Sequence, residues 1–283
     1  MNYRRCILFG IVLMFAGALF AEETMTIDHP EQPDAREIVN RVAENWKRNL
    51  DLAQDYTYQA RQVIQFLDKN GKVTGTKTET HEFSIIFGKQ YKKLIARDDM
   101  PLSAKEQKKE EEKLNKFFKK RKRMSDKDRA KEMEKREREF KREIGDEFPY
   151  MLHFEIIGDE MLDGRPVWVI RAEPKTGYKS NSRFGSLFSK LSGVIWVDKA
   201  DCEWVKLDTS VADDFNFAWL LLRLHKGARI EAEEALINDE IWLPKRALIE
   251  GSMRVAWAVQ RVRAEVTFSQ YQKFATDVNI MYE

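Results

Sequence analysis

The side chains best suited to catalysis or metal binding are few and widely spaced. The four histidines, His29, His81, His153 and His225, show neither a His-x-x-x-His nor a His-Glu-x-x-His spacing. Cys202 has no assignable base beside it that would make it a nucleophile. The chain also lacks a Gly-x-Ser-x-Gly elbow, a Ser-x-x-Lys pair, a P-loop and a Gly-x-Gly-x-x-Gly loop. We therefore expect a protein that is not an enzyme and that holds neither a metal nor a cofactor.

Aromatic residues are a more informative set, with 7 Trp, 17 Phe and 8 Tyr. On a strand, a large aromatic side chain either fills the core or lines the wall of an apolar cavity. The candidates for such a cavity wall are Phe83, Ile85, Phe87, Trp168, Trp196, Trp204, Trp242 and Trp257. The sequence alone leaves both interpretations open for these residues.

The N-terminal residues 1–21 are typical of a secretory signal peptide. Arg4 and Arg5 form its positive start, and an apolar stretch from Cys6 to Phe20 follows. This stretch is shorter than the roughly 20 residues that span a bilayer, which favours a signal peptide. An uncleaved inner-membrane anchor is the alternative. Cleavage after Ala21 or Ala18 would release the chain into the periplasm of a Gram-negative-type bacterium. Residues 22–283 are then expected to form a single domain.

Loss of the signal peptide changes the charge balance and the cysteine count. It removes two Arg and no acidic residue, which leaves 47 basic against 47 acidic residues. A neutral, exported chain has no bulk positive charge to favour nucleic acid as a partner. Because Cys202 then stands alone, no internal disulfide can form, and the fold depends on its own core.

Strand-like runs make up most of the chain, and turn residues separate them. An amphipathic helix is predicted first, over residues 35–51, with a capping pair at Asp34 and Glu37. The predicted strands and hairpins cover 56–67, 83–87, 90–98, 153–175, 192–211, 228–253 and 253–269. Residues 217–227 fit either a buried strand or a helix. The pattern predicts a mainly β, α+β fold with about nine to eleven antiparallel strands in one strongly curled sheet or half-open β-barrel.

The alternation of apolar residues changes phase within the last predicted strand, residues 253–269. Met253, Val255, Trp257 and Val259 alternate in one phase, and Val262, Ala264, Val266 and Phe268 alternate in the other. We expect a β-bulge near Gln260 and Arg261, which would shift the phase inside one strand.

Residues 104–147 form a charged insertion with helix-forming composition. Its stretch 105–143 holds 18 Lys or Arg residues against 11 Asp or Glu residues. Two helices broken near Ser125 and Asp126 are the simplest arrangement, either as a solvated surface or as a basic arm for a membrane or an envelope protein. The densest basic cluster, and the candidate for docking, is Lys119, Lys120, Arg121, Lys122 and Arg123.

A short amphipathic stretch lies between the two central hairpins. Phe184, Leu187, Phe188 and Leu191 follow the i, i+3, i+4, i+7 spacing of one helix face. This stretch is a candidate lid over a cavity, and a plain helical connection is the alternative.

Two turn-and-strand motifs resemble those of the Lol-type periplasmic carrier superfamily, the outer-membrane lipoprotein-sorting proteins. One reads Gly-x-x-Trp-Val-Asp at Gly193, Trp196, Val197 and Asp198, and the other is Asn238, Asp239, Trp242 and Pro244. The resemblance covers residues 35–98 and 150–275. It implies a half-open barrel, covered by helices, that encloses an apolar cavity for acyl chains. The insertion has no counterpart in the core of that family.

Two functional hypotheses follow from the sequence. The first is a periplasmic, non-enzymatic carrier or binding protein for a lipid or for the acyl part of a lipoprotein. The second is a structural or sensory envelope protein that binds a protein partner through the same sheet and the charged helices. An occupied cavity distinguishes the first from the second.

Overall fold

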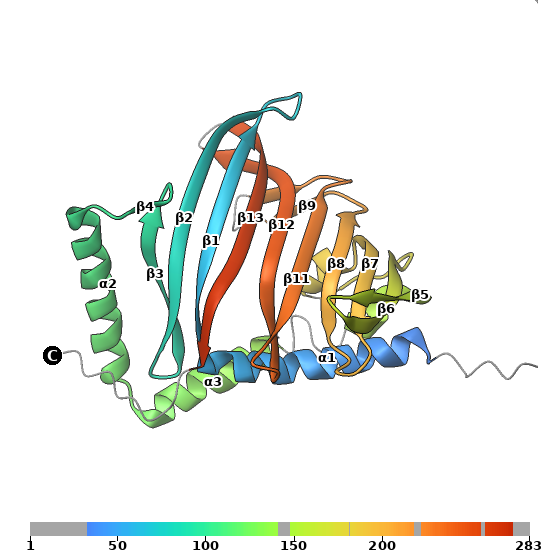
Figure 1. Cartoon of the computed structure of the whole chain (residues 1–283), viewed down its shortest axis with the longest axis horizontal. Coiled ribbons are helices and arrows are strands. Elements are labelled where there is room, and N and C mark those ends of the chain that lie inside the picture. The colour runs from blue at the N-terminus through green and yellow to red at the C-terminus, as the bar shows by residue number, and fades with distance from the viewer. Residues whose placement is uncertain (1–32, 141–147, 181, 218–221, 256–257, 274–283) are drawn as a thin grey trace, which may run out of the picture. The chain divides into compact units, whose positions relative to one another are not determined.

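A computed structural model (Figure 1) describes residues 33–140, 148–180, 182–217, 222–255 and 258–273. The described residues belong to one compact unit, which spans 33–283. The predicted signal peptide, residues 1–21, lies outside the described residues.

The helices and strands follow the order that the sequence pattern predicts. The helices are α1 (Ala35–Leu52), α2 (Ala104–Lys122), α3 (Asp126–Phe140), α4 (Phe148–Met151) and α5 (Arg183–Phe188), and a 3-10 turn, Ala53–Asp55, follows α1. The first six strands are β1 (Tyr56–Leu67), β2 (Val73–Ile86), β3 (Lys89–Arg97), β4 (Met100–Pro101), β5 (Leu152–Leu162) and β6 (Arg165–Pro174). The others are β7 (Leu191–Asp198), β8 (Trp204–Val211), β9 (Phe215–Phe217), β10 (Leu222–Leu224), β11 (Arg229–Ile237), β12 (Ile241–Val255) and β13 (Ala258–Lys273).

The strands form a single antiparallel sheet that is not closed. Eleven strands lie in the order β4-β3-β2-β1-β13-β12-β11-β8-β7-β6-β5, while β9 and β10 attach beside β12 (Figure 1). Consecutive strands are neighbours in the sheet except at two places, where β1 pairs with β13 and where β11 pairs with β8. The mainly β, open, antiparallel architecture predicted from the sequence is therefore confirmed.

Cross-strand pairing shows which residues share a face, because directly opposite residues in an antiparallel sheet point to the same side. One row of such pairs crosses the sheet through Ile156, Ile170, Ile195, Leu207, Ala232, Ala247, Val266, Gln62, Glu79 and Arg97. The neighbouring row runs through Phe154, Ala172, Gly193, Thr209, Ile230, Ile249, Ala264, Ile64 and Lys77. We call the face that carries these two rows the inner face.

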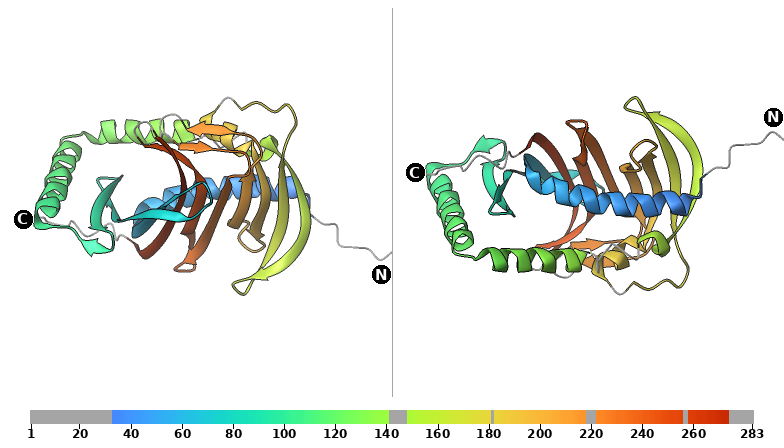
Figure 2. Two further views of the ribbon diagram at one scale, coloured as in Figure 1. Left: turned by 90° about the horizontal axis from the view of Figure 1, so that it is seen from above. Right: turned by 90° about the horizontal axis from the view of Figure 1, so that it is seen from below.

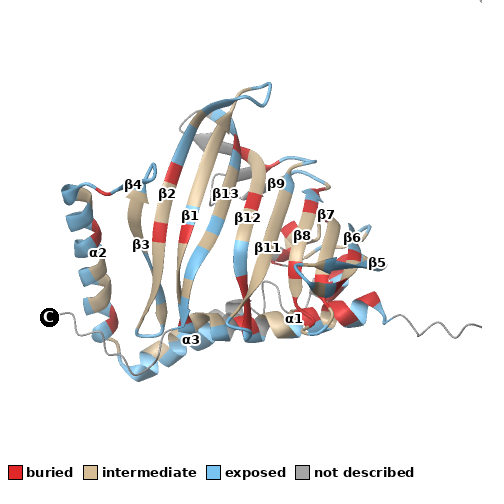
Figure 3. Cartoon of the chain, in the orientation of Figure 1, coloured by how far each residue is buried: buried red, intermediate tan, exposed pale blue. Residues whose placement is uncertain are grey.

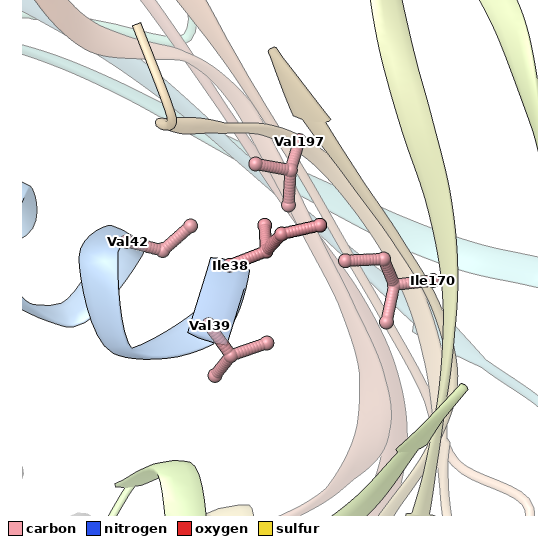
Figure 4. Close-up of a cluster of buried hydrophobic side chains, with 5 residues drawn as sticks. All are labelled: Ile38, Val39, Val42, Ile170 and Val197. Atoms are coloured by element: carbon pink, nitrogen blue, oxygen red, sulfur yellow. The ribbon is translucent and has the colours of Figure 1, made fainter. Parts of the chain in front are cut away.

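Helix α1 packs on one end of the inner face. Its apolar stripe recurs at helical spacing, so Ile38, Val39 and Val42 all point at the sheet and are buried against Ile170 and Val197 (Figure 4). Figure 2 shows α1 running across several strands rather than along one. This cluster anchors the N-terminal helix to strands β6 and β7.

The residues that carry the family resemblance build turns and fix the β7–β8 hairpin. Asp198 accepts two hydrogen bonds from the Arg165 guanidinium, at 2.6 and 2.9 Å. Arg165 also lies over the ring of Trp242, and the indole nitrogen of Trp242 donates to Asp201 at 2.9 Å. A Cβ atom at Gly193 would lie 2.2 Å from the backbone oxygen of Asp208, so only glycine fits there. The motifs are therefore structural.

The predicted bulge near Gln260 and Arg261 is wrong. Val255 of β12 pairs with Ala258 of β13, so the chain reverses between them and the phase change marks two strands. Residues 217–227, which the sequence left undecided, contain the end of β9 and all of β10. A register shift does occur opposite Pro244, between Glu233 and Glu234.

The charged insertion contains two helices, broken where the sequence predicts. The Ser103 side chain and Glu106 form a capping box at the start of α2. At the start of α3, the Ser125 hydroxyl accepts a hydrogen bond from the backbone N–H of Asp128 at 3.1 Å. Helix α2 contacts the sheet at β3.

Candidate functional site

The inner face changes character from one side of the sheet to the other. At strands β5 to β8 the residues of these rows are apolar except Thr209, and helices α1 and α5 pack over much of them. At β11, β12, β13 and β1 they are apolar except Gln62, and at β2 and β3 the rows end in charged residues such as Glu79 and Arg97. The candidate site lies along this gradient from apolar to charged residues.

The covered part of the inner face is an ordinary core. Ile170 and Val197 are 0% and 1% exposed beneath α1. Helix α5 covers the adjacent area, where Leu187 packs with Val211 and Leu224. Buried side chains of α1, α5 and the strands pack against one another in this part.

The neighbouring apolar strip is only partly buried. It consists of Ala232, Ala247, Val266, Ala264 and Ile64, which adjoin one another across β11, β12, β13 and β1. Figure 3 shows partly buried residues predominating along β11 and β1. Among the described residues, the main helix contacts with the sheet fall on β3, β5 and β12, and none of comparable extent falls on β13, β1 or β2.

The opposite, outer face of the same strands is charged. Arg246 is paired with Glu265 at 2.5 Å and with Glu231 at 3.0 Å. Arg229 donates to Asp208 at 2.7 Å in a similar cross-strand pair. Because ion pairs cover the outer face, the apolar strip on the inner face is the surface suited to an apolar ligand.

An aromatic cluster adjoins the apolar strip. Tyr58 stacks on Phe83 with ring centroids 4.7 Å apart, and its ring is also 6.0 Å from that of Phe268 and 5.3 Å from that of Tyr271. All four rings belong to partly buried residues. Burial raises the pKa of the Tyr58 and Tyr271 hydroxyls, so both rings are uncharged at neutral pH. The cluster offers an apolar wall with two hydroxyl groups.

A pocket of about 610 Å³ lies next to this cluster, between α2 and strands β2 and β3. Its lining from α2 consists of Glu110, Lys113, Lys116, Phe117 and Lys120. Its lining from the strands consists of Glu79, His81, Tyr91, Lys92, Leu94 and Arg97. Five of these side chains are basic and two are acidic, and we call this the basic pocket.

The aromatic residues predicted to line one cavity do not come together. Trp168 and Trp204 pack in the core beneath α1. Trp196 and Trp242 belong to a separate cluster with Val167 and Val205. This distribution assigns the Trp side chains largely to the core, which was the alternative interpretation of the sequence.

The three candidates on and after β2 lie apart from these Trp clusters, in the part of the sheet next to α2. Phe83 belongs to the aromatic cluster, and Ile85 follows it on the same strand, two residues on. Phe87 lies in the β2–β3 turn, is 40% exposed and contacts Phe118 of α2. Trp257 lies outside the described residues.

The candidate lid is a helix packed on the sheet. Leu187 and Leu191 are 8% and 6% exposed, and Phe188 packs against them. The Ser182 hydroxyl caps the helix by accepting a hydrogen bond from the N–H of Gly185 at 2.9 Å. The side chain of Phe184 lies outside the described residues. An opening of this helix remains a proposal.

The predicted basic docking cluster does not point to one side. Lys119, Lys120, Lys122 and Arg123 are exposed, whereas Arg121 is 4% exposed. Arg121 donates to the carbonyl oxygen of Phe87 at 2.8 Å and is paired with Glu132 of α3. Of the five, only Lys120 lines the basic pocket. Arg121 therefore holds α2, α3 and the β2–β3 turn together.

Glu203 is an unusual buried acid at the end of the β7–β8 hairpin. Its side chain is almost fully buried, at 1% exposed, and neither carboxylate oxygen has a hydrogen-bond partner among the described residues. Burial raises the pKa of Glu203 to about 8, against the opposing effect of Arg48. Burial, followed by the nearby acid Glu203, raises the pKa of Glu234. Glu203 is therefore mainly protonated at neutral pH.

The part of the chain that the structure describes has few other groups suited to metal binding or catalysis. No group of three His, Cys, Asp or Glu side chains there is placed to hold a metal ion. His225 contacts Asp214 at 3.3 Å on the surface, and Cys202 is buried. No described helix has both the length and the apolar composition needed to cross a membrane.

Several residues of the site could not be recognised from the sequence. The common phase of Val262, Ala264, Val266 and Phe268 was the available signal for the apolar strip. The alternation of Tyr56, Tyr58 and Ala60 on β1 was a second signal. No pattern in the sequence indicated that Lys92 of β3 would face Lys116 and Lys120 of α2.

Comparisons with known proteins add a set of distant structural matches. No family model matches the chain, and no curated protein matches it. A structure described as an outer membrane lipoprotein-sorting protein domain from Vibrio parahaemolyticus is 14% identical, with 87% of this chain and 94% of that chain covered and a TM-score of 0.36. A LolA superfamily protein from Nitrosomonas europaea is 10% identical, with 85% and 93% covered and a TM-score of 0.32.

A third match is a complex of two proteins. The MucA/MucB complex of Pseudomonas aeruginosa is 10% identical, with 86% of this chain and 99% of that chain covered and a TM-score of 0.26. The structural matches thus include the kind of protein that the sequence motifs resemble. At identities of 14% or less, the residues of this chain decide what its site can bind.

Proposed function

We propose that the protein is a non-enzymatic carrier or binding protein for a lipid or for the acyl part of a lipoprotein. The observation that supports this proposal is the apolar strip, an unbroken set of partly buried apolar residues on the inner face. An acyl chain laid along the strip would remove apolar surface of both partners from water. The aromatic cluster at the end of the strip would contribute further apolar contact.

The energy available from such contact is sufficient for useful affinity. Each methylene group removed from water contributes about 0.8 kcal/mol. A chain of about sixteen carbons therefore offers on the order of 10 kcal/mol before the costs of association are subtracted. The side chains at Ala232, Ala247 and Ala264 are small, so a chain can approach the strands closely.

The proposed setting is the periplasm. The N-terminal signal-like segment supports export, and the ionic outer face of β11 to β13 suits an aqueous compartment. A carrier there would shield an acyl chain between two membranes. The sorting of outer-membrane lipoproteins and the transport of free lipid are both compatible with this chemistry.

Uptake of an apolar fluorescent probe tests the proposal. Two variants, which place the same side chain on opposite faces of the sheet at neighbouring positions, provide a matched comparison. Ala264→Phe fills the strip with a large side chain, while Gln65→Phe adds the same side chain to the outer face of β1, beside the Ile64 that pairs with Ala264. We expect N-phenyl-1-naphthylamine to bind the unmodified protein and the Gln65→Phe variant. The Ala264→Phe variant should bind it several-fold more weakly.

Circular dichroism of both variants is the control that checks whether the sheet is intact. Equal binding by the two variants would place the probe elsewhere and refute the strip as the ligand site. If the unmodified protein takes up no apolar probe, the carrier proposal fails. The envelope protein that docks a protein partner through its sheet and charged helices then becomes the hypothesis to test.

A further inference from the structure

The basic pocket has an excess of positive charge that is not neutralised within the fold. Its two acids are already paired, because Glu110 contacts Lys113 at 2.5 Å and Glu79 contacts Lys77 at 2.9 Å. Arg97 is paired as well, with Glu106 at 2.7 Å. The charges of these groups largely cancel one another.

Three lysines of the pocket remain without an ion pair. Lys92, Lys116 and Lys120 make no salt bridge to any described residue, and all three are exposed to solvent. Two come from α2 and one from β3, so their ammonium groups reach the same space from two sides. Three unpaired cations around one pocket form a site for an anion with several oxygen atoms, such as a phosphate group.

The pocket is joined to the apolar part of the inner face. The Lys92 ammonium lies 5.8 Å from the ring centroid of Phe83, which stacks on Tyr58 in the aromatic cluster. His81 of the pocket pairs with Ala60, and Ala60 pairs with Phe268 of the cluster. A single molecule can therefore contact the cationic and the apolar surfaces together.

The size of the pocket suits a polar head group. Its volume of about 610 Å³ lies within the range of roughly 300–1,000 Å³ typical of small-molecule sites. The lining also includes Phe117 and Tyr91, whose rings are 4.8 Å apart. They can cover the glycerol part of a lipid beside its phosphate.

From this arrangement we infer that the ligand is an anionic glycerophospholipid, with its head group in the basic pocket and its acyl chains along the aromatic cluster and the apolar strip. This inference rests on the proposed carrier function and narrows it to one class of lipid. The charged insertion then has a defined role, since α2 supplies two of the three free cations.

Titration calorimetry with short-chain lipids below their micellar concentrations tests the inference. The probes are dihexanoyl phosphatidylglycerol, dihexanoyl phosphatidylcholine and glycerol phosphate. We expect phosphatidylglycerol to bind about tenfold or more tightly than phosphatidylcholine, the size of effect given by one or two charge-assisted contacts. Glycerol phosphate, which has no acyl chains, should bind far more weakly than either lipid.

The decisive variant is Lys92→Gln/Lys116→Gln/Lys120→Gln. We expect it to bind phosphatidylglycerol only as tightly as phosphatidylcholine, while its affinity for phosphatidylcholine stays the same. The control is Lys109→Gln/Lys119→Gln/Lys122→Gln, which removes three exposed charges of α2 outside the pocket lining. The control should keep the preference for the anionic lipid.

The outcomes separate this inference from the proposed function. Equal binding of the two lipids by the unmodified protein overturns the head-group site but leaves a lipid carrier. If the pocket variant and the control lose the preference for phosphatidylglycerol equally, the preference comes from diffuse surface charge. That result would also overturn the head-group site. Absence of binding of both lipids would contradict the carrier function itself.

Discussion

The ammonium group of Lys92 lies 5.8 Å from the centre of the Phe83 ring, and this contact joins the basic pocket to the aromatic cluster. Lys92 comes from β3 and Phe83 from β2, and the two residues are directly paired in the sheet. The pairing places an unneutralised cation beside a partly buried aromatic wall. An amphiphile with an anionic head group matches both surfaces at once.

The pKa of His81 depends on the charges that line the basic pocket. Burial and the nearby Lys92 hold the pKa of His81 below its ordinary value of 6.5, and Glu79 and Glu110 oppose this effect. We expect Lys92→Gln to raise the pKa of His81, because a repulsive charge is removed. Bound phosphatidylglycerol should raise it as well, since a phosphate group favours the imidazolium form.

Imidazole NMR signals followed through a pH titration measure this shift. Lys93→Gln is the matched control, because Lys93 is the next residue along β3 and lies on the other face. Two results would contradict a phosphate group near His81. One is an equal shift of the His81 pKa in the two variants, and the other is no shift when phosphatidylglycerol is added.

Because Glu203 is buried, we expect the free energy of unfolding to fall as pH rises. Its pKa is about 8 in the folded state against 4.5 when unperturbed, so between these values the folded state keeps a proton that the unfolded state has lost. Stability therefore decreases through this window, by up to about 1.4 kcal/mol per pH unit. Urea unfolding at pH 5 and at pH 8.5 measures the effect.

We expect Glu203→Gln to remove much of this dependence and to stabilise the protein at pH 8.5. Some dependence should remain, because the pKa of Glu234 is raised as well. Glu44→Gln, on the exposed surface of α1, should leave the dependence unchanged. A Glu203→Gln variant with the pH profile of the unmodified protein would contradict the assignment.

Arg121 is predicted to hold the insertion in place rather than to bind a partner. Arg121→Met leaves the carbonyl oxygen of Phe87 and the carboxylate of Glu132 without this donor. We expect a loss of about 1–3 kcal/mol, confined to α2, α3 and the β2–β3 turn. Amide hydrogen exchange should show faster exchange in these segments, while Lys122→Met, at an exposed neighbour, has little effect. Similar exchange in the two variants would refute this role.

The glycine of the β7 motif is predicted to be irreplaceable for steric reasons. In Gly193→Ala the added Cβ would lie 2.2 Å from the backbone oxygen of Asp208, which forces β7 and β8 apart. We expect a loss of about 1–3 kcal/mol. Gly158→Ala on β5, where the added atom meets nothing within 4 Å, is the control. Thermal unfolding measures both, and equal midpoints would show that the strands adjust freely.

The sequence predicted the fold well because its signals are local. The turns at Asp163-Gly164 and Asn238-Asp239 have residues with positive φ, and alternation between such turns identifies strands. The pairing of β1 with β13 joins residues such as Ile64 and Ala264, which lie far apart in the chain. No local pattern reveals that contact.

The candidate site was harder to predict for the same reason. Trp168 and Trp242 were conspicuous by type, but burial under α1 and beside Arg165 places them in the core. The apolar strip uses alanines and valines that carry no chemical signature. The basic pocket depends on how α2 packs beside β3, a contact that charge composition cannot indicate.

Whether the inner face holds an amphiphile can be measured by native mass spectrometry of the purified protein, followed by solvent extraction of whatever it carries. We predict a bound mass that is stoichiometric with the protein and that extraction identifies as an anionic phospholipid or another acyl-bearing molecule. A bare polypeptide mass, with no gain of mass after incubation with phosphatidylglycerol, would contradict this prediction.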